Sequence, residues 1–203
     1  MLSLLTTLLL QVHSHGDNEI FVPSAKSLSD HHLAGYTVIL LGLLAFLEYR
    51  EGARIPWLRY VWPVPLLGVA CFLFFLSDTA EPWGLWFFHG DWAHAELEHK
   101  FLEGAAILIA LIDLLVRTGW LKSRGWSHLI PSLMVFAGVL LIFHHGNHEP
   151  IVHTQHNWMG SEATALGLTK FTANLQPKPS WVARYALPIL FVVLGLQLVF
   201  YIE

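Results

Sequence analysis

Long apolar blocks alternate with short polar segments along the whole chain, and this pattern predicts helices that cross a membrane. Two of the blocks are LAGYTVILLGLLAFL at 33–47 and FLEGAAILIALIDLLV at 101–116. A helix needs about 20 mostly apolar residues to span a bilayer. The expected fold is therefore all-α, a polytopic transmembrane helical bundle of about six spans. The expected spans are residues 31–49, 62–79, 94–117, 128–145, 157–174 and 182–202.

The composition supports a membrane protein and excludes several other classes. Of the 203 residues, 55% are hydrophobic and 13% are charged, whereas soluble domains carry about 25% charged residues. A net charge of −4 does not favour a nucleic-acid partner, so the lipid bilayer is the expected surrounding. The single cysteine, Cys71, excludes an internal disulfide and a CxxC-type site.

Two segments are too short or too polar for a full span. The first residues, MLSLLTTLLLQVHSHG, contain an apolar run that is too short to cross a bilayer, and no basic residue precedes it. We therefore expect residues 1–14 to be a signal peptide or a short interfacial helix, and residues 15–203 to be a single transmembrane helical domain. The expected span 157–174 is the second such segment, and it also fits a buried or half-inserted helix.

Lysine and arginine gather on one side of this arrangement. Nine of the eleven lie in three segments, and only Lys26 and Lys100 lie elsewhere. The three basic segments are 49–61, 117–127 and 170–184. Basic loops stay on the cytoplasmic side of a membrane. The expected location is a bacterial inner (cytoplasmic) membrane, with the other ends of the spans facing the periplasm.

Histidine is distributed in the opposite way. Twelve of the thirteen histidines fall on the side expected to face the periplasm, and only His128 falls on the basic side. Five of them lie in one stretch, FHHGNHEPIVHTQHNWMG at 143–160. Ordinary interfacial hydrogen bonds would explain any one of these histidines, but their shared placement favours a common chemical task.

Neutral imidazole is the commonest metal ligand in proteins, so we expect the outer histidines to bind a transition metal. The best ligands, one from the outer end of each of four spans, are His32, His99, His145 and His156. Their neighbours His31 and His144 are interchangeable with His32 and His145, because a helix turns about 100° per residue and the sequence does not fix its phase that closely. The full set of candidate metal ligands is His31, His32, His94, His99, Glu103, His144, His145, His148, His153 and His156.

A weak internal repeat brings three of the histidine-bearing segments into register. DHHLAGYTVILLG (30–42), LEHKFLEGAAILIA (97–110) and TQHNWMGSEATALG (154–167) each place histidine ahead of a helix and glycine about one turn later. In the first and third segments two glycines are seven residues apart, which predicts close helix contacts along one face. A bundle packed through these faces would bring the histidines together.

Glu103 and Glu162 lie inside apolar spans, where an ionisable group is costly and usually functional. Glu103 stands one turn after His99, so we expect it to ligate the metal, accept a proton, or hold that histidine in one tautomer. The alternative, for Glu162 as well, is a protonated carboxyl bonded to a neighbouring helix. Asp113 and Arg117 are four residues apart, which predicts an ion pair.

Copper is the metal we expect, with zinc and iron as alternatives. Beyond Met1 the chain has only Met134 and Met159, so it does not resemble a methionine-rich copper(I) path. Glu96 and His99 form an E-x-x-H pair of the kind found in di-iron bundles. Such sites use two of these pairs, and this chain has one.

The motifs DHHLAG, LEHKFLEG, FHHGNHE and TQHNWMG, each joined to a Leu/Gly-rich span, resemble bacterial polytopic copper-resistance membrane proteins of the CopD-like kind. The likeness covers residues 30–173. It implies copper handling at the periplasmic face of the inner membrane, with a periplasmic metallochaperone or further membrane subunits as partners. The scarcity of methionine departs from many copper proteins.

Two functions fit these observations. The first is a non-enzymatic membrane protein that binds, delivers or transports the metal. The second is a membrane oxidoreductase, or a subunit of one, that uses the same cluster as a His/Glu-ligated copper or di-iron centre. A b-type haem subunit fits less well, because its paired histidines would be expected deeper in the membrane. The sequence leaves open whether the chain is an enzyme.

Overall fold

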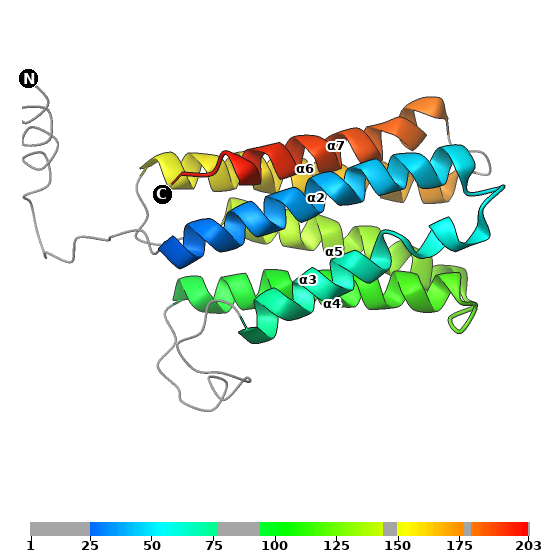
Figure 1. Cartoon of the computed structure of the whole chain (residues 1–203), viewed down its shortest axis with the longest axis horizontal. Coiled ribbons are helices and arrows are strands. Elements are labelled where there is room, and N and C mark those ends of the chain that lie inside the picture. The colour runs from blue at the N-terminus through cyan, green and yellow to red at the C-terminus, as the bar shows by residue number, and fades with distance from the viewer. Residues whose placement is uncertain (1–24, 77–93, 144–149, 177–179, 203) are drawn as a thin grey trace, which may run out of the picture.

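The computed structural model describes residues 25–76, 94–143, 150–176 and 180–202, which form helices with no strand among them. The prediction of an all-helical chain is therefore confirmed. The α-helices run along one long axis, so their ends gather at the two ends of the bundle (Figure 1). The helices are α2 (Ala25–Glu51), the short 3₁₀ helix η1 (Pro56–Tyr60), α3 (Pro63–Leu76), α4 (His94–Arg117), α5 (Arg124–Ile142), α6 (Pro150–Leu175) and α7 (Trp181–Val199).

The six described α-helices form a closed ring. α2 packs against α7 and α7 against α6, and the contacts continue through α5, α4 and α3 back to α2. The most extensive contacts join α2 to α7 and α5 to α6, followed by those that join α3 to α4. Within each of these three pairs the helices run in opposite directions (Figure 1). The ring is therefore built from three antiparallel helix pairs.

Three helical segments are long and apolar enough to cross a membrane. They are Leu28–Glu51, Pro56–Leu76 and Arg124–Ile142, which correspond to the first, second and fourth expected spans. A further apolar helix, Arg184–Val199, is shorter. α4 and α6 are 24 and 26 residues long, and both carry charged residues between their ends.

Several helices begin earlier than the apolar blocks suggested. α2 begins six residues before the expected span 31–49, and α6 begins seven residues before 157–174. α5 begins at Arg124, where the side chain of Ser123 caps the helix by accepting a hydrogen bond from a backbone N–H. Pro131, which the expected boundary placed in the first turn, therefore lies inside α5 and is buried. Caps and polar first turns, which hydropathy does not reveal, account for these differences.

Glycines let two of the three pairs approach closely. A Cβ built on Gly35 of α2 would lie 2.8 Å from the carbonyl oxygen of Gly195 in α7. A Cβ on Gly160 of α6 would lie 2.6 Å from the carbonyl oxygen of Gly138 in α5. Real side chains do not come this close to a backbone, so a larger residue would push the helices apart. The predicted close contact through these glycines is confirmed.

Equivalent proline and glycine positions form the close contacts in both of these helix pairs. The partner helices contain PSLMVFAG (131–138) and PILFVVLG (188–195), which share the pattern P-x-x-x-V-x-x-G. In each, the carbonyl oxygen of the proline would lie 2.8 Å from a Cβ on the second glycine of the repeat, Gly167 in α6 or Gly42 in α2. α3 contains PLLGVACF (65–72), which keeps the proline and the valine but ends in phenylalanine. The α3–α4 pair is thus a diverged version of the arrangement seen in the other two.

A buried lysine of α4, which is ion-paired within its own helix, joins α4 to α3 instead of a close glycine contact. A Cβ on Gly104 of α4 would meet only Phe74, at an ordinary 3.7 Å. The ammonium group of Lys100 donates to the carbonyl oxygen of Leu73 in α3 at 3.0 Å and to Oε2 of Glu103 at 2.7 Å. The side chains of Lys100 and Glu103 are only 4% and 10% exposed.

Candidate metal centre

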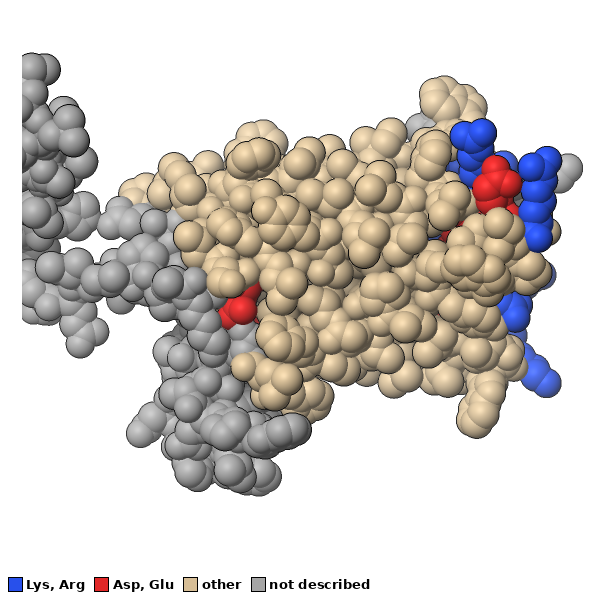
Figure 2. Space-filling view, in the orientation of Figure 1, with Lys and Arg blue, Asp and Glu red and all other residues tan. Residues whose placement is uncertain are grey.

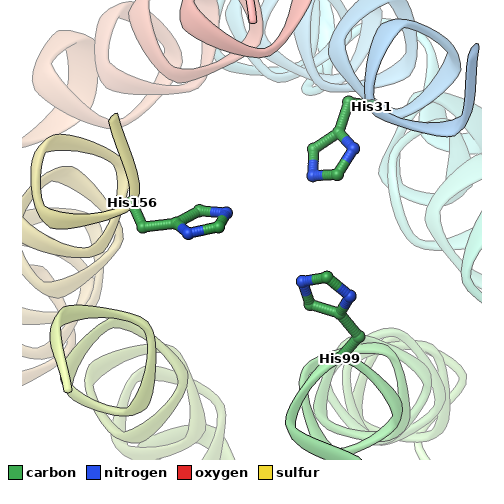
Figure 3. A group of neighbouring side chains, drawn as sticks. All are labelled: His31, His99 and His156. Carbon is green, nitrogen blue, oxygen red and sulfur yellow. The ribbon is translucent and has the colours of Figure 1, made fainter. Parts of the chain in front are cut away.

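Three histidines, one from each helix pair, meet near one end of the ring. His31 of α2, His99 of α4 and His156 of α6 point toward a common centre (Figure 3). Their ring centroids are 6.1, 6.3 and 6.5 Å apart, so the triangle is nearly regular. One ring nitrogen from each histidine lies within 4.8 Å of the other two. His156 is 3% exposed, and the other two are half-buried.

The three histidines occupy equivalent positions in their helices. Each is the sixth or seventh residue of its helix. Ten residues after each histidine stands a buried apolar residue, and these three residues, Leu41, Ile109 and Leu166, belong to one cluster. The repeat seen in the sequence therefore produces two layers across the ring, a histidine layer and an apolar layer below it.

Tyr201, which follows the end of α7, covers two of the three histidines. Its ring stacks on that of His31, with centroids 4.0 Å apart and planes 12° apart, and it lies 5.8 Å from the ring of His156. The side chain is 1% exposed. The sequence analysis missed this residue because it belongs to no repeat. Its place at the outer end of the last expected span was the available signal.

A cavity of about 200 Å³ adjoins the histidine triad. Besides the three imidazoles, its lining includes the carboxyl groups of Asp30 and Glu103 and the thioether of Met159. No lysine or arginine from the described part of the chain lines it. The charges and donor atoms around this cavity therefore suit a cation.

The donor set fits a transition-metal ion. Imidazole suits copper, zinc, iron and nickel. Metal–imidazole bonds are about 2.0–2.1 Å long, so nitrogens that share one ion lie roughly 3.5 Å apart. The triad is wider than this, with nitrogens up to 4.8 Å apart. Rotations of the rings about their broad terminal torsions can supply a closure of this size.

Glu103 lies beside the triad, as its position one turn after His99 suggested. It lines the same cavity, and its Oε2 accepts a hydrogen bond from Lys100. The ion pair places a carboxyl group next to the imidazoles and balances its charge. Lys100 was not among the predicted site residues, although its spacing of three from Glu103 is typical of a helical ion pair.

The structure separates the triad from several other candidate ligands. His32 is half-buried and does not belong to the group, because it is turned about 100° from His31 around the helix. His153 is exposed, and its Nδ1 lies 3.1 Å from the amide nitrogen of Asn157. The side chain of His94, and the whole of residues 144–149 with His144, His145 and His148, lie outside the described residues.

Two other acidic residues of the spans, the buried Asp113 and the half-buried Glu162, have partners in the structure. Asp113 pairs with Arg117, which confirms the predicted ion pair, and Arg117 also pairs with Glu48 of α2. Glu162 accepts a hydrogen bond of 3.0 Å from the side-chain amide of Gln197 in α7. Glu162 therefore bonds to a neighbouring helix, the alternative to a direct functional role, and it does not belong to the triad.

No family model, no curated protein and no solved structure matches this chain. The assignment of the site therefore depends on its geometry and its donor atoms.

Proposed function

We propose that the protein is a polytopic membrane protein that binds one transition-metal ion, copper, through His31, His99 and His156. The observation that carries the proposal is the convergence of three imidazoles from three separate helices, with one nitrogen of each within 4.8 Å of the others. A three-histidine site leaves a position for a further ligand, as in catalytic zinc sites. The neighbouring cavity offers further oxygen and sulfur donors from Asp30, Glu103 and Met159.

The bundle is placed in a bacterial inner membrane with the triad near the periplasm. Three helices are long and apolar enough to cross a bilayer. Lysine and arginine gather at the end of the bundle where α2 and α4 end (Figure 2), and basic ends stay in the cytoplasm. In this orientation the ion would come from, and return to, the periplasmic side.

Copper is favoured over zinc and iron by two features. The resemblance of residues 30–173 to CopD-like copper-resistance proteins implies copper handling. Met159 is 2% exposed and lines the cavity beside the triad, and a thioether is a soft ligand that suits copper(I).

Binding and delivery explain the architecture better than passage through the bundle. The apolar layer of Leu41, Ile109 and Leu166 lies directly below the triad on the side away from the periplasm. The three side chains are at most 6% exposed. A hydrated ion would have to cross this layer to reach the cytoplasm, and such constrictions exclude water and ions.

The second candidate function is that of a membrane oxidoreductase, or a subunit of one, built on the same ion. The cavity of about 200 Å³ beside the triad favours it, because the space would admit a small substrate next to the metal. A di-iron centre is less favoured, since the cavity and triad offer two carboxyl residues, Asp30 and Glu103, where di-iron bundles use four.

Metal analysis of the purified protein, combined with absorption and electron paramagnetic resonance spectra, tests the proposal. We expect one copper per chain, with a copper(II) signal after oxidation. Affinity should fall below about pH 6, because imidazole must lose its proton before it can bind a metal. Two irons per chain would favour the oxidoreductase, and a Soret band would indicate haem. A protein that binds no transition metal at micromolar concentrations would contradict the proposal.

Cysteine labelling tests the orientation independently. In a Cys71→Ser background, single cysteines would replace Ser123, between α4 and α5, and Asn147, between α5 and α6. We expect an impermeant thiol reagent added from the periplasm to label only the cysteine at position 147. Labelling at position 123 alone would show that the protein has the opposite orientation in the membrane.

A further inference from the structure

A second cavity, of about 350 Å³, lies within the ring on the other side of the apolar layer. Its lining includes Asp113 of α4 and Lys170 of α6, each fourteen residues after the histidine of its own helix. The equivalent position in α2 is Ala45, which also lines the cavity. The two cavities therefore occupy the same interior of the helix ring at different depths.

The carboxyl groups in the second cavity are already engaged. Arg117 pairs with both Asp113 and Glu48 and donates a further hydrogen bond of 2.7 Å to the carbonyl oxygen of Arg59. The guanidinium also lies over the ring of Trp62, 5.3 Å from its centroid. Arg117 thus occupies acceptors that a cationic ligand would need.

The remaining polar groups that line this cavity include three donors. Lys170 lines it, and no residue in the described part of the chain forms an ion pair or a hydrogen bond with its ammonium group. The hydroxyl groups of Ser127 and Tyr49 also line it, with no hydrogen-bond partner among the same residues. The carboxyl group of Asp113 belongs to the same lining, but it is paired with Arg117. The available groups therefore suit an anion that accepts several hydrogen bonds.

The surplus of basic side chains at this end of the bundle also favours the binding of an anion. Among the described residues, eight basic and three acidic side chains belong to the last two turns of α2, α4 and α6, to the segments that follow them, and to the first turns of α5 and α7. The basic ones are Arg50, Arg54, Arg59, Arg117, Lys122, Arg124, Lys170 and Arg184, and the acidic ones are Glu48, Glu51 and Asp113. Figure 2 shows the cluster of lysine and arginine at this end. A surplus of this size attracts anions to the mouth of the cavity.

We propose that the second cavity binds a phosphate group, held by Lys170 with the hydroxyls of Ser127 and Tyr49. Lys170 and Arg117 make the cavity unsuitable for a second metal ion, so it is a separate site and not a continuation of the metal path. Two sources share this chemistry. One is the headgroup of an anionic phospholipid, which basic pockets between membrane helices commonly bind, and the other is free phosphate.

Calorimetric titration of the detergent-purified, delipidated full chain with inorganic phosphate tests the site, with chloride at matched ionic strength as the blank. Lys170→Met removes the charge and keeps the length of the side chain. We expect it to weaken binding about tenfold or more, since it removes a charge-assisted hydrogen bond. Lys170→Arg should retain binding, and Ser127→Ala should weaken it less than Lys170→Met. Arg50→Met is the matched control, because Arg50 is a cation of the same end whose side chain is 70% exposed and does not line the cavity.

Native mass spectrometry with phosphatidylglycerol or phosphatidylcholine then separates the two sources. Lipid that is retained by the wild type, lost in Lys170→Met and competed by phosphate identifies a headgroup site. Phosphate binding without selective lipid retention identifies a site for the free anion. The metal content of every variant reports folding independently, because the triad lies on the other side of the apolar layer. The proposal is overturned if neither phosphate nor phospholipid binds above the blank, or if Lys170→Met binds both as the wild type does.

Discussion

Two helix pairs of this protein are joined through glycines, and the third is joined through charges. In α2–α7 and α5–α6, glycine meets the backbone of the partner helix so closely that a Cβ would lie 2.6–2.8 Å from a carbonyl oxygen. In α3–α4, Phe72 stands where the other partner helices have glycine, and Lys100 reaches across to the carbonyl oxygen of Leu73. The comparison shows that one repeated arrangement can be kept together by two different kinds of contact.

The difference between the glycine-joined pairs and the α3–α4 pair also determines which helix places an ion pair beside the triad. The position four residues after the histidine is glycine in α2 and α6, Gly35 and Gly160, but it is Glu103 in α4. The looser α3–α4 contact makes room for this carboxyl group and for its partner Lys100. As a result, the diverged pair contributes an ion pair beside the triad, whereas the helices of the glycine-joined pairs contribute Asp30 and Met159 besides their imidazoles.

The largest effect should come from breaking the ion pair of the diverged pair. Lys100→Met leaves the carboxylate of Glu103 buried without its partner, which costs about 3–5 kcal/mol in the free energy of unfolding. The double variant Lys100→Met/Glu103→Leu should recover most of this loss, because an apolar pair of similar volume replaces the ions. Unfolding in mixed micelles measures all three proteins. A double variant that is as unstable as the single one would show that the loss comes from the missing contact of Lys100 with Leu73 of α3 and not from an unpaired carboxylate.

A smaller effect should come from filling a glycine contact. Gly160→Ala places a Cβ 2.6 Å from the carbonyl oxygen of Gly138, and the helices must separate, at a cost of about 1–3 kcal/mol. Gly104→Ala is the matched control in the diverged pair, where the new Cβ meets only Phe74 at 3.7 Å. It should be neutral or stabilising by up to about 1 kcal/mol, because alanine favours a helix more than glycine does. Equal destabilisation by the two substitutions would remove the distinction between the pairs.

The smallest of these effects concerns the tyrosine that covers two of the histidines. Tyr201→Leu removes the ring stacked on His31 and should weaken metal binding about tenfold, the lower end of the range for groups that orient metal ligands. Tyr201→Phe keeps the stacked ring and should bind almost as well as the wild type. Competition titration against a chelator of known affinity measures both. Equal weakening in the two variants would assign the effect to the hydroxyl group and not to stacking.

The all-helical fold and the convergence of histidines followed from simple patterns. Apolar blocks gave the positions of the helices, and the glycines seven residues apart gave the faces through which two pairs pack. The phase of each helix could not be obtained in this way, so His32 was preferred although His31 faces the interior of the ring. That choice depends on the start of α2 and on its packing against α7, which hydropathy does not encode.

Polar contacts in the interior of the bundle were predicted only where the two residues are close together in the sequence. The Asp113–Arg117 pair is four residues apart and was expected, whereas the link from Arg117 to Glu48 spans 69 residues and required the fold. Tyr201 and the second cavity likewise arise from the ring closing between distant helices. The relation between PSLMVFAG, PILFVVLG and PLLGVACF became apparent only when their glycine contacts were compared in space.

Copper stoichiometry in a set of histidine variants tests the central claim most directly. His31→Ala, His99→Ala and His156→Ala each remove one imidazole of the triad, and His32→Ala and His153→Ala remove imidazoles that lie near it but outside it. We expect one copper per chain in the wild type and in the two controls, and loss of at least two orders of magnitude in affinity for each triad variant, about 2.7 kcal/mol or more. Full copper binding by all three triad variants, or loss in the controls equal to that in the triad variants, would contradict the proposed site.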